Sequence, residues 1–140
     1  MIENINPPGW KQAKGYANGM LADGKRLYTG GQIGWNSDQV FEHHDFVGQF
    51  EQTLRNITEI VREAGGDVTD IVRLTWFITD KKAYLAHQKE TGEAYRRVIG
   101  NHYPAMSVLV VAGLIEDEAL VEIEATAEIG NSKAREQDRD

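Results

Sequence analysis

Apolar residues recur along the chain with two periods, and these periods predict both helices and strands. Between residues 46 and 64 the apolar positions lie three or four residues apart, which predicts an amphipathic helix ending at Gly65-Gly66. A second helix is predicted over residues 83–99. Residues 71–79 and 120–129 alternate in side-chain character, as strands do when their two faces meet different surroundings.

The segment from Met106 to Val111 is apolar at both parities and rich in β-branched residues. This pattern favours a strand that is covered on both faces and lies in the middle of a sheet. Near the N-terminus, a strand-like stretch over residues 15–21 is followed by Asp23-Gly24 and a second apolar stretch over residues 25–29. Asp-Gly favours a two-residue hairpin turn, so these two stretches are expected to pair with each other.

The order of hairpin, helix, strand, helix and two strands predicts an α+β two-layer sandwich, with a mixed sheet and two helices on one face. We expect one domain over residues 1–130 and a disordered charged tail over residues 131–140. The sheet face away from the helices would carry Trp76 or Phe77 and Met106 or Ser107, among other groups. A monomer rarely exposes such an apolar patch, so the pattern predicts self-association through this face.

Composition narrows the classes of function. The chain has 140 residues with 15 basic and 22 acidic side chains, a net charge of −7, and no cysteine, which excludes thiol catalysis and disulfides. The negative charge, without a basic cluster, disfavours nucleic acid as a partner. No apolar run approaches the length of a membrane helix, so we expect a cytoplasmic protein with no membrane partner. His43, His44, His87 and His102 lack metal-ligand spacing, and neither a metal nor a cofactor is expected.

Six short motifs follow one another along the chain. They are Gly15-Tyr16, Gly30–Ile33, Ala64–Gly66, Phe77 with Thr79-Asp80, Tyr103–Ala105, and Val121–Ala125. With these motifs the chain resembles the RidA/YjgF family of reactive-intermediate deaminases over about residues 9–129. The resemblance implies a chorismate-mutase-like fold and a homotrimer that binds small molecules in clefts between its subunits.

The resemblance also assigns roles to single positions. Glu122 matches a glutamate that helps position the water attacking an imine carbon, although it could simply face a wet interface. The other candidate residues are expected to line the cleft and bind substrate. They are Tyr16, Gly31, Trp35, Tyr84, Met106 and Ser107.

Met106 is the departure from the family pattern. In the deaminase branch this position is an arginine that forks onto the substrate carboxylate, whereas a thioether has no charge and donates no hydrogen bond. Losing such a contact costs about 2–5 kcal/mol, so efficient turnover of ordinary 2-imino acids is not expected. Arg73 or Arg96 could supply the missing charge. Two functions remain open: hydrolysis of an imine or enamine C–N bond, and a binding, sensing or holdase-like trimer without chemistry.

Overall fold

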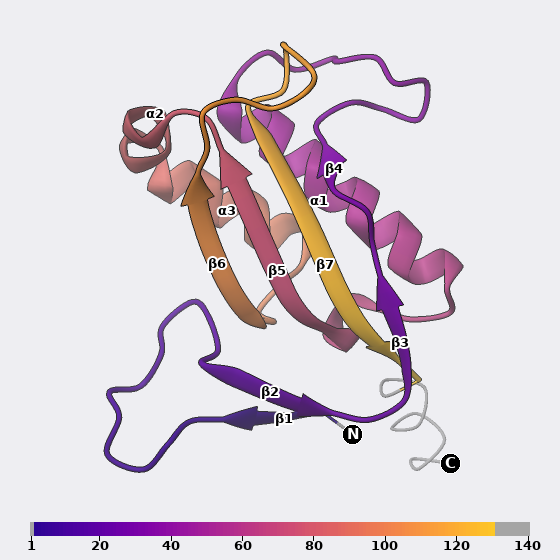
Figure 1. Cartoon of the computed structure of the whole chain (residues 1–140), viewed down its shortest axis with the longest axis vertical. Helices are drawn as coiled ribbons and strands as arrows, with labels where there is room; N and C mark the ends of the chain where they lie inside the picture. The colour runs from indigo at the N-terminus through magenta and orange to yellow at the C-terminus, as the bar shows by residue number, and fades with distance from the viewer. Residues whose placement is uncertain (1, 131–140) are drawn as a thin grey trace.

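The sheet is built around β7 (Val121–Ile129), which has a neighbour on each side (Figure 1). On one side β7 pairs antiparallel with β3 (Lys25–Tyr28) and with the short β4 (Gln32–Ile33). On the other side it pairs antiparallel with β5 (Ile71–Ile78), which pairs parallel with β6 (Ala105–Val110). The sheet order is therefore β3-β7-β5-β6, and the sheet is mixed as expected.

The computed structural model describes residues 2–130. The expected disordered tail over residues 131–140 lies outside the described residues. Among the helices within residues 2–130, none is both long enough and apolar enough to cross a membrane.

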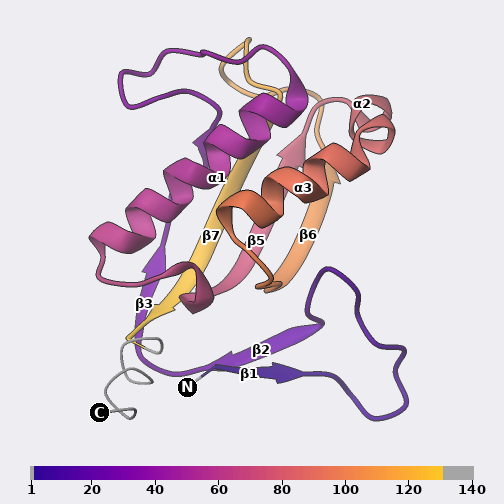
Figure 2. The same ribbon diagram turned by 180° about the vertical axis from the view of Figure 1, so that it is seen from behind.

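Two main helices, α1 (Phe46–Glu63) and α3 (Gln88–Val98), lie side by side over one face of the sheet (Figure 2). Helix α1 begins where the Asp45 side chain accepts a hydrogen bond from the Gly48 N–H at 3.2 Å, a cap that contributes about 1 kcal/mol. Beyond its C-terminus, Gly65 has φ +90°, a backbone that glycine adopts without a steric penalty. The predicted helix over residues 46–64 is confirmed.

The predicted second helix is divided into α2 (Lys81–Ala86) and α3. His87 separates them, with φ −124° and ψ 29° outside the helical region. Its ring nitrogen Nδ1 lies 2.8 Å from the Ala83 carbonyl oxygen, and its N–H donates to the Tyr84 oxygen at 3.2 Å. Because His87 makes both contacts with the last turn of α2, the helix ends there and α3 starts in a new direction. A single helix over residues 83–99 is therefore wrong.

The core lies between the two main helices and the sheet. Phe50, Leu54, Ile57 and Val61 of α1 are fully buried, as expected from their spacing. They pack on the inward side chains of the two central strands. These are Leu74, Trp76, Ile78, Val121, Ile123, Ala125 and Ala127. Each large apolar side chain removed from water contributes about 1.5–3 kcal/mol to folding.

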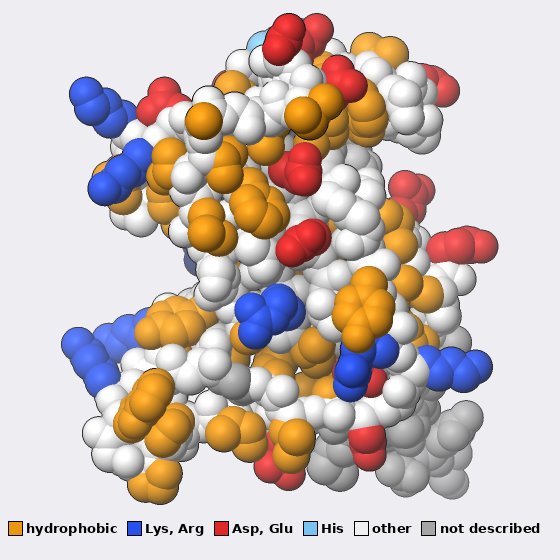
Figure 3. All heavy atoms as spheres, in the orientation of Figure 1, with side chains coloured by type: hydrophobic (Ala, Val, Ile, Leu, Met, Phe, Trp, Pro, Cys, Tyr) orange, Lys and Arg blue, Asp and Glu red, His pale blue; other side chains and the backbone are white. Residues whose placement is uncertain are grey.

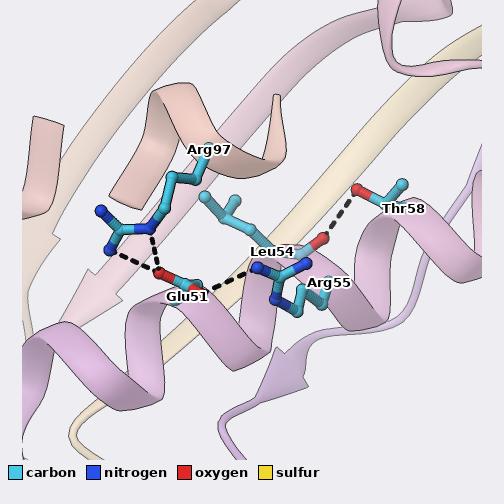
Figure 4. Close-up of polar contacts among 5 residues, drawn as sticks. All are labelled: Glu51, Leu54, Arg55, Thr58 and Arg97. Atoms are coloured by element: carbon cyan, nitrogen blue, oxygen red, sulfur yellow. Dashed lines mark hydrogen bonds and ion pairs between the residues drawn. The ribbon is translucent and has the colours of Figure 1, made fainter. Parts of the chain in front are cut away.

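A polar clamp joins α1 and α3 at the surface (Figure 4). Arg97 donates to one carboxylate oxygen of Glu51 from Nε at 2.9 Å and Nη2 at 2.6 Å, and Arg55 donates to the other oxygen at 2.9 Å. Burial by itself would raise the pKa of Glu51, but the hydrogen bonds from the two guanidinium groups outweigh it and hold that pKa below its ordinary value. Both arginine side chains are about half exposed, so each pair contributes at most about 1 kcal/mol.

The predicted hairpin at Asp23-Gly24 is wrong. Strand β2 (Gly19–Ala22) pairs antiparallel with β1 (Ile2–Ile5) in a separate two-stranded sheet. The chain bends at Gly24, where φ is +129°, and continues into β3. Because β3 forms its hydrogen bonds with β7, it leaves β2 without the partner that the turn signal suggested.

The apolar strand over residues 106–111 is also placed differently from the expectation. Strand β6 is an edge strand, because β7 inserts between β3 and β5 and leaves β5 as the strand that pairs with β6. On its other side, an isolated parallel bridge joins its first residue, Ala105, to Ala17. The side chains of Val108, Leu109 and Val110 are 39%, 45% and 54% exposed. Leu109 pairs with Phe77 on the sheet face away from the helices, here called the open face.

Candidate functional site

A cavity of about 230 Å³ lies where β6 and β5 meet α2 and α3, on the helix side of the sheet. Met106 lines it, because its register opposite Leu74 turns its side chain toward the helices rather than toward the open face. Tyr84 of α2 lines it as well. The remaining lining residues are Gly15, Trp76, Gln88, Thr91, Gly92, Tyr95, Arg96 and Tyr103.

Aromatic rings form most of the apolar wall. The rings of Trp76 and Tyr84 meet edge to face, with centroids 6.3 Å apart and an interplanar angle of 86°. Tyr95 and Tyr103 stack at 5.3 Å and 11°. The Tyr95 hydroxyl donates to the His102 carbonyl oxygen at 2.6 Å, and burial raises the pKa of the Tyr95 phenol, so this ring is fixed as a neutral donor.

Arg96 places a positive charge at this cavity. A Cβ built on Gly92, one turn earlier in α3, would lie 3.4 Å from Nη1 and 3.9 Å from Nη2 of Arg96. The guanidinium group therefore folds back along α3, over another residue of the cavity wall. The next residue, Arg97, is held by Glu51 on the α1 side. Of the two arginines named as replacements for the family arginine, Arg96 shares the cavity with Met106.

The acidic candidate lies on the opposite side of the sheet. Glu122 of β7 is half-buried on the open face, opposite Phe77 of β5. Its carboxylate packs so closely on Gly31 that a Cβ at Gly31 would lie 2.7 Å from the carboxylate carbon. Ser107 of β6 is exposed on the same face, opposite Thr75. Figure 3 shows this face, with acidic side chains beside hydrophobic ones.

Other candidate residues lie apart from both groups. Tyr16 is 44% exposed and follows Gly15 of the cavity wall. Trp35 lies beyond β4 against α1, where its carbonyl oxygen accepts from the Asn56 amide at 2.8 Å. Arg73 lines a separate open-face hollow with Glu124.

The structure therefore brings the candidate residues together as two groups rather than one. Tyr84 and Met106 belong to the helix-side cavity, while Gly31, Ser107 and Glu122 belong to the open face. Because the sheet separates these groups, Met106 and Glu122 do not meet within one chain. Any cleft that contains both must include a second chain.

Trp76, Tyr95 and Tyr103 were not among the sequence-predicted site residues. Their patterns are those of core positions, and Trp76 is indeed 6% exposed. Strand parity could have found Trp76, because once Met106 is placed opposite Leu74, Trp76 shares its face. Within residues 2–130, no group of three or more histidine, aspartate or glutamate side chains is placed to hold a metal ion.

The mixed sheet with two main helices on one face defines a two-layer α+β protein, and its candidate residues lie on both faces of the sheet. The chain belongs to the RidA/YjgF family, as the motifs predicted: the family model described as endoribonuclease L-PSP matches residues 9–129.

Two relatives and two solved structures illustrate the likeness. RutC family proteins of Pasteurella multocida and Haemophilus influenzae are 36% and 35% identical over 104 residues, which is 74% of this chain and 80% and 79% of those proteins. The Rid family protein YyfB of Yersinia pestis, described as of unknown function, superposes with a TM-score of 0.80 at 29% identity, covering 91% of this chain and 98% of that one. The YjgF gene product of E. coli gives 0.64 at 34% identity, covering 81% and 87%.

Proposed function

We propose that this chain is a hydrolytic, deaminase-type enzyme that opens imine or enamine C–N bonds of small substrates. The observation that carries the proposal is the Glu122 carboxylate, half-buried on the open face and packed against Gly31. A carboxylate held in this way can accept a hydrogen bond from a water molecule and orient its oxygen toward an electrophilic carbon. Membership of the RidA/YjgF family supports the same chemistry.

The reaction balances with water as the only co-reactant. Glu122 takes a proton from water as the water oxygen bonds to the imine carbon, and the C=N π electrons move to nitrogen. Glu122 returns this proton to the nitrogen, which gives a neutral carbinolamine. Glu122 then moves the hydroxyl proton to the nitrogen as the carbonyl forms, the C–N bond breaks with its electron pair on ammonia, and the carboxylate is regenerated. Imine and water thus become a carbonyl compound and ammonia.

The working cleft in this proposal lies between the subunits of a homotrimer with a chorismate-mutase-like fold. Met106 and Glu122 lie on opposite sides of the sheet, so a second chain must bring a helix-side cavity to an open face. The exposed apolar residues of β6 support such an assembly, because a lone chain would leave Leu109 and Val110 in water. A mass in solution of three times the 15.7 kDa chain mass would bear this out.

Ammonia release from freshly generated imines and neutral enamines tests the chemistry. We expect Glu122→Gln to lower turnover by about 100-fold or more, the usual contribution of a positioned acid or base. Glu124→Gln, two residues along the same strand face, is the matched control and should keep its rate. If Glu122→Gln turns over substrate as fast as the unaltered protein, the proposal is wrong. The same assay is applied to Met106→Arg. If this variant hydrolyses 2-imino acids and the unaltered protein does not, the catalytic groups are intact and the natural substrate belongs to a different class.

A second candidate is a trimer that binds or senses a small metabolite without chemistry. The aromatic lining of the cavity favours it, since such walls hold planar ligands without any catalytic group. Tight binding of a ligand without turnover of any imine would establish this alternative. The charge of −7 and the glutamates of the open face disfavour a ribonuclease activity, because both repel a phosphate backbone.

A further inference from the structure

A second hollow, of about 390 Å³, is lined by residues of the two main helices, α1 and α3. Its α1 wall includes Arg55, Glu59 and Arg62, which are exposed. Leu54 and Val61 of the same helix are fully buried in the core. The hollow therefore lies on the side of the helices that faces away from the sheet, which is the side nearer the viewer in Figure 2. It stays accessible in the proposed trimer, which uses the open face.

This hollow, here called the arginine groove, gathers positive charge on a chain whose net charge is −7. Arg55 and Arg62 come from α1 and Arg97 comes from α3, while Glu59 is an acidic side chain of the same wall. Within residues 2–130, Arg62 makes no ion pair. An anion from solution would complement this charge, because opposite charges on the two partners favour association.

Glu51 holds two of these arginines in place and leaves part of each guanidinium group available. Arg97 donates to Glu51 from Nε and Nη2, and Arg55 donates from Nη2 (Figure 4). In the hydrogen bonds within residues 2–130, neither Nη1 of Arg97 nor Nε and Nη1 of Arg55 takes part. Because Glu51 already restricts both side chains, they lose less conformational freedom when they bind a second anion.

The remainder of the groove suits hydroxyl groups. Gln52 donates its amide N–H to the Asn56 side-chain oxygen at 2.9 Å, so the amide oxygen of Gln52 can accept from a ligand. The Glu59 carboxylate is a second acceptor in the wall. The volume of about 390 Å³ falls within the roughly 300–1,000 Å³ of ordinary small-molecule sites. The groove thus has room for a polar body as well as for an anionic group.

We propose that the arginine groove binds a small phosphorylated polyol. The three arginines hold its phosphate, while Gln52 and Glu59 accept hydrogen bonds from its hydroxyl groups. Arginine suits phosphate because the planar guanidinium fork donates two parallel N–H bonds to two phosphate oxygens. The helix-side cavity and the open face take no part in this site, so the inference goes beyond the proposed function and does not depend on it.

Titration calorimetry with sorbitol 6-phosphate, sorbitol and inorganic phosphate, at one pH and ionic strength, tests the site. We expect the unaltered protein to bind sorbitol 6-phosphate, and Arg62→Gln to weaken that binding about tenfold or more, the range for a lost charge-assisted contact. Arg96→Gln is the matched control, because it removes the same charge from α3 at the helix-side cavity, and it should bind unchanged. Inorganic phosphate should bind more weakly than the ester because it lacks the polyol hydroxyl groups, and sorbitol should bind more weakly still.

Backbone amide resonances give the location of the bound molecule. Those of Arg62 and Val98, on the two walls of the groove, should shift with sorbitol 6-phosphate. Four results would overturn the proposal: no binding at millimolar concentration, equal affinity of Arg62→Gln and the unaltered protein, an equal loss in Arg62→Gln and Arg96→Gln, or equal affinity for the ester and either sorbitol or inorganic phosphate. Arg62→Gln should hydrolyse imines at the unaltered rate, and Glu122→Gln should bind sorbitol 6-phosphate unchanged, so this proposal and the catalytic one fail separately.

Discussion

Adding one methyl group at Gly34 should lower the stability of the protein. Gly34 is buried just after β4, and a Cβ there would lie 2.6 Å from Cβ and 2.8 Å from Cα of Gln49. Gln49 cannot move aside easily, because it is fully buried and its amide makes three hydrogen bonds. Two are donated, to the carbonyl oxygens of His43 at 3.1 Å and Glu118 at 2.9 Å, and one is accepted from the Leu120 N–H at 2.8 Å.

The expected loss of stability for Gly34→Ala follows from these contacts. Overpacking a tight site costs about 1–3 kcal/mol, and each weakened hydrogen bond adds about 1 kcal/mol. Removing a glycine from the unfolded chain returns about 0.4–1 kcal/mol, because φ at Gly34 is not positive. The net expectation is a loss of about 2–3 kcal/mol, which shifts the urea midpoint down by about 1 M.

Gly31→Ala is the matched control, three residues earlier. Its Cβ would collide with the carboxylate end of Glu122, a half-buried side chain that can rotate away. Stability should change by less than about 1 kcal/mol, while the displaced carboxylate should lower imine turnover. Urea unfolding followed by tryptophan fluorescence at one fixed protein concentration measures both variants, since assembly would couple stability to concentration. The reasoning is refuted if Gly34→Ala unfolds at the midpoint of the unaltered protein, or if Gly31→Ala is the less stable variant.

Three further outcomes are expected. A double-mutant cycle of Glu51→Gln with Arg97→Gln should give a coupling of about 0.5–1 kcal/mol at pH 7. The pKa of Glu51 is lower in the folded protein than in the unfolded chain, so this coupling is fully present above the unfolded pKa of about 4.3. It should be lost as pH falls through the folded pKa, as measured by urea unfolding at several pH values. A coupling that stays constant with pH would contradict this reasoning. Tyr95→Phe should cost about 1–2 kcal/mol in the same assay by removing the bond to His102, and an unchanged midpoint would argue against that bond. Leu109→Lys should dissociate the proposed trimer, as seen by sedimentation, and an unchanged mass would place the interface elsewhere.

The sequence predicted those elements whose signals are local. The spacing of apolar residues in α1 and the alternation in β7 both report one buried face, and that face is buried in the structure. Strand order is not local. Asp23-Gly24 signals a change of direction but not which strand pairs afterwards, so β2 was assigned to β3 although it pairs with β1.

The candidate site was harder to predict for the same reason. Strand β6 is apolar at both parities, so the pattern left open whether Met106 or Ser107 faces the helices. The register of β6 against β5 decides it, and this register is a tertiary feature. The cavity is lined by residues of both α2 and α3, and no apolar period predicts the break at His87 that separates these helices.

The proposed assembly would explain both the unexpected exposure of β6 and the separation of the candidate residues. A strand apolar on both faces is expected where both faces are covered, yet Val108 and Leu109, on opposite faces of β6, are both exposed in the single chain. Met106 on one side of the sheet and Glu122 on the other likewise form no site together in one chain. The proposed trimer answers both observations, because a neighbour that covers β6 can also bring its open face to the cavity. In such a trimer the apolar pattern of β6 would report burial between chains rather than a place in the middle of one sheet.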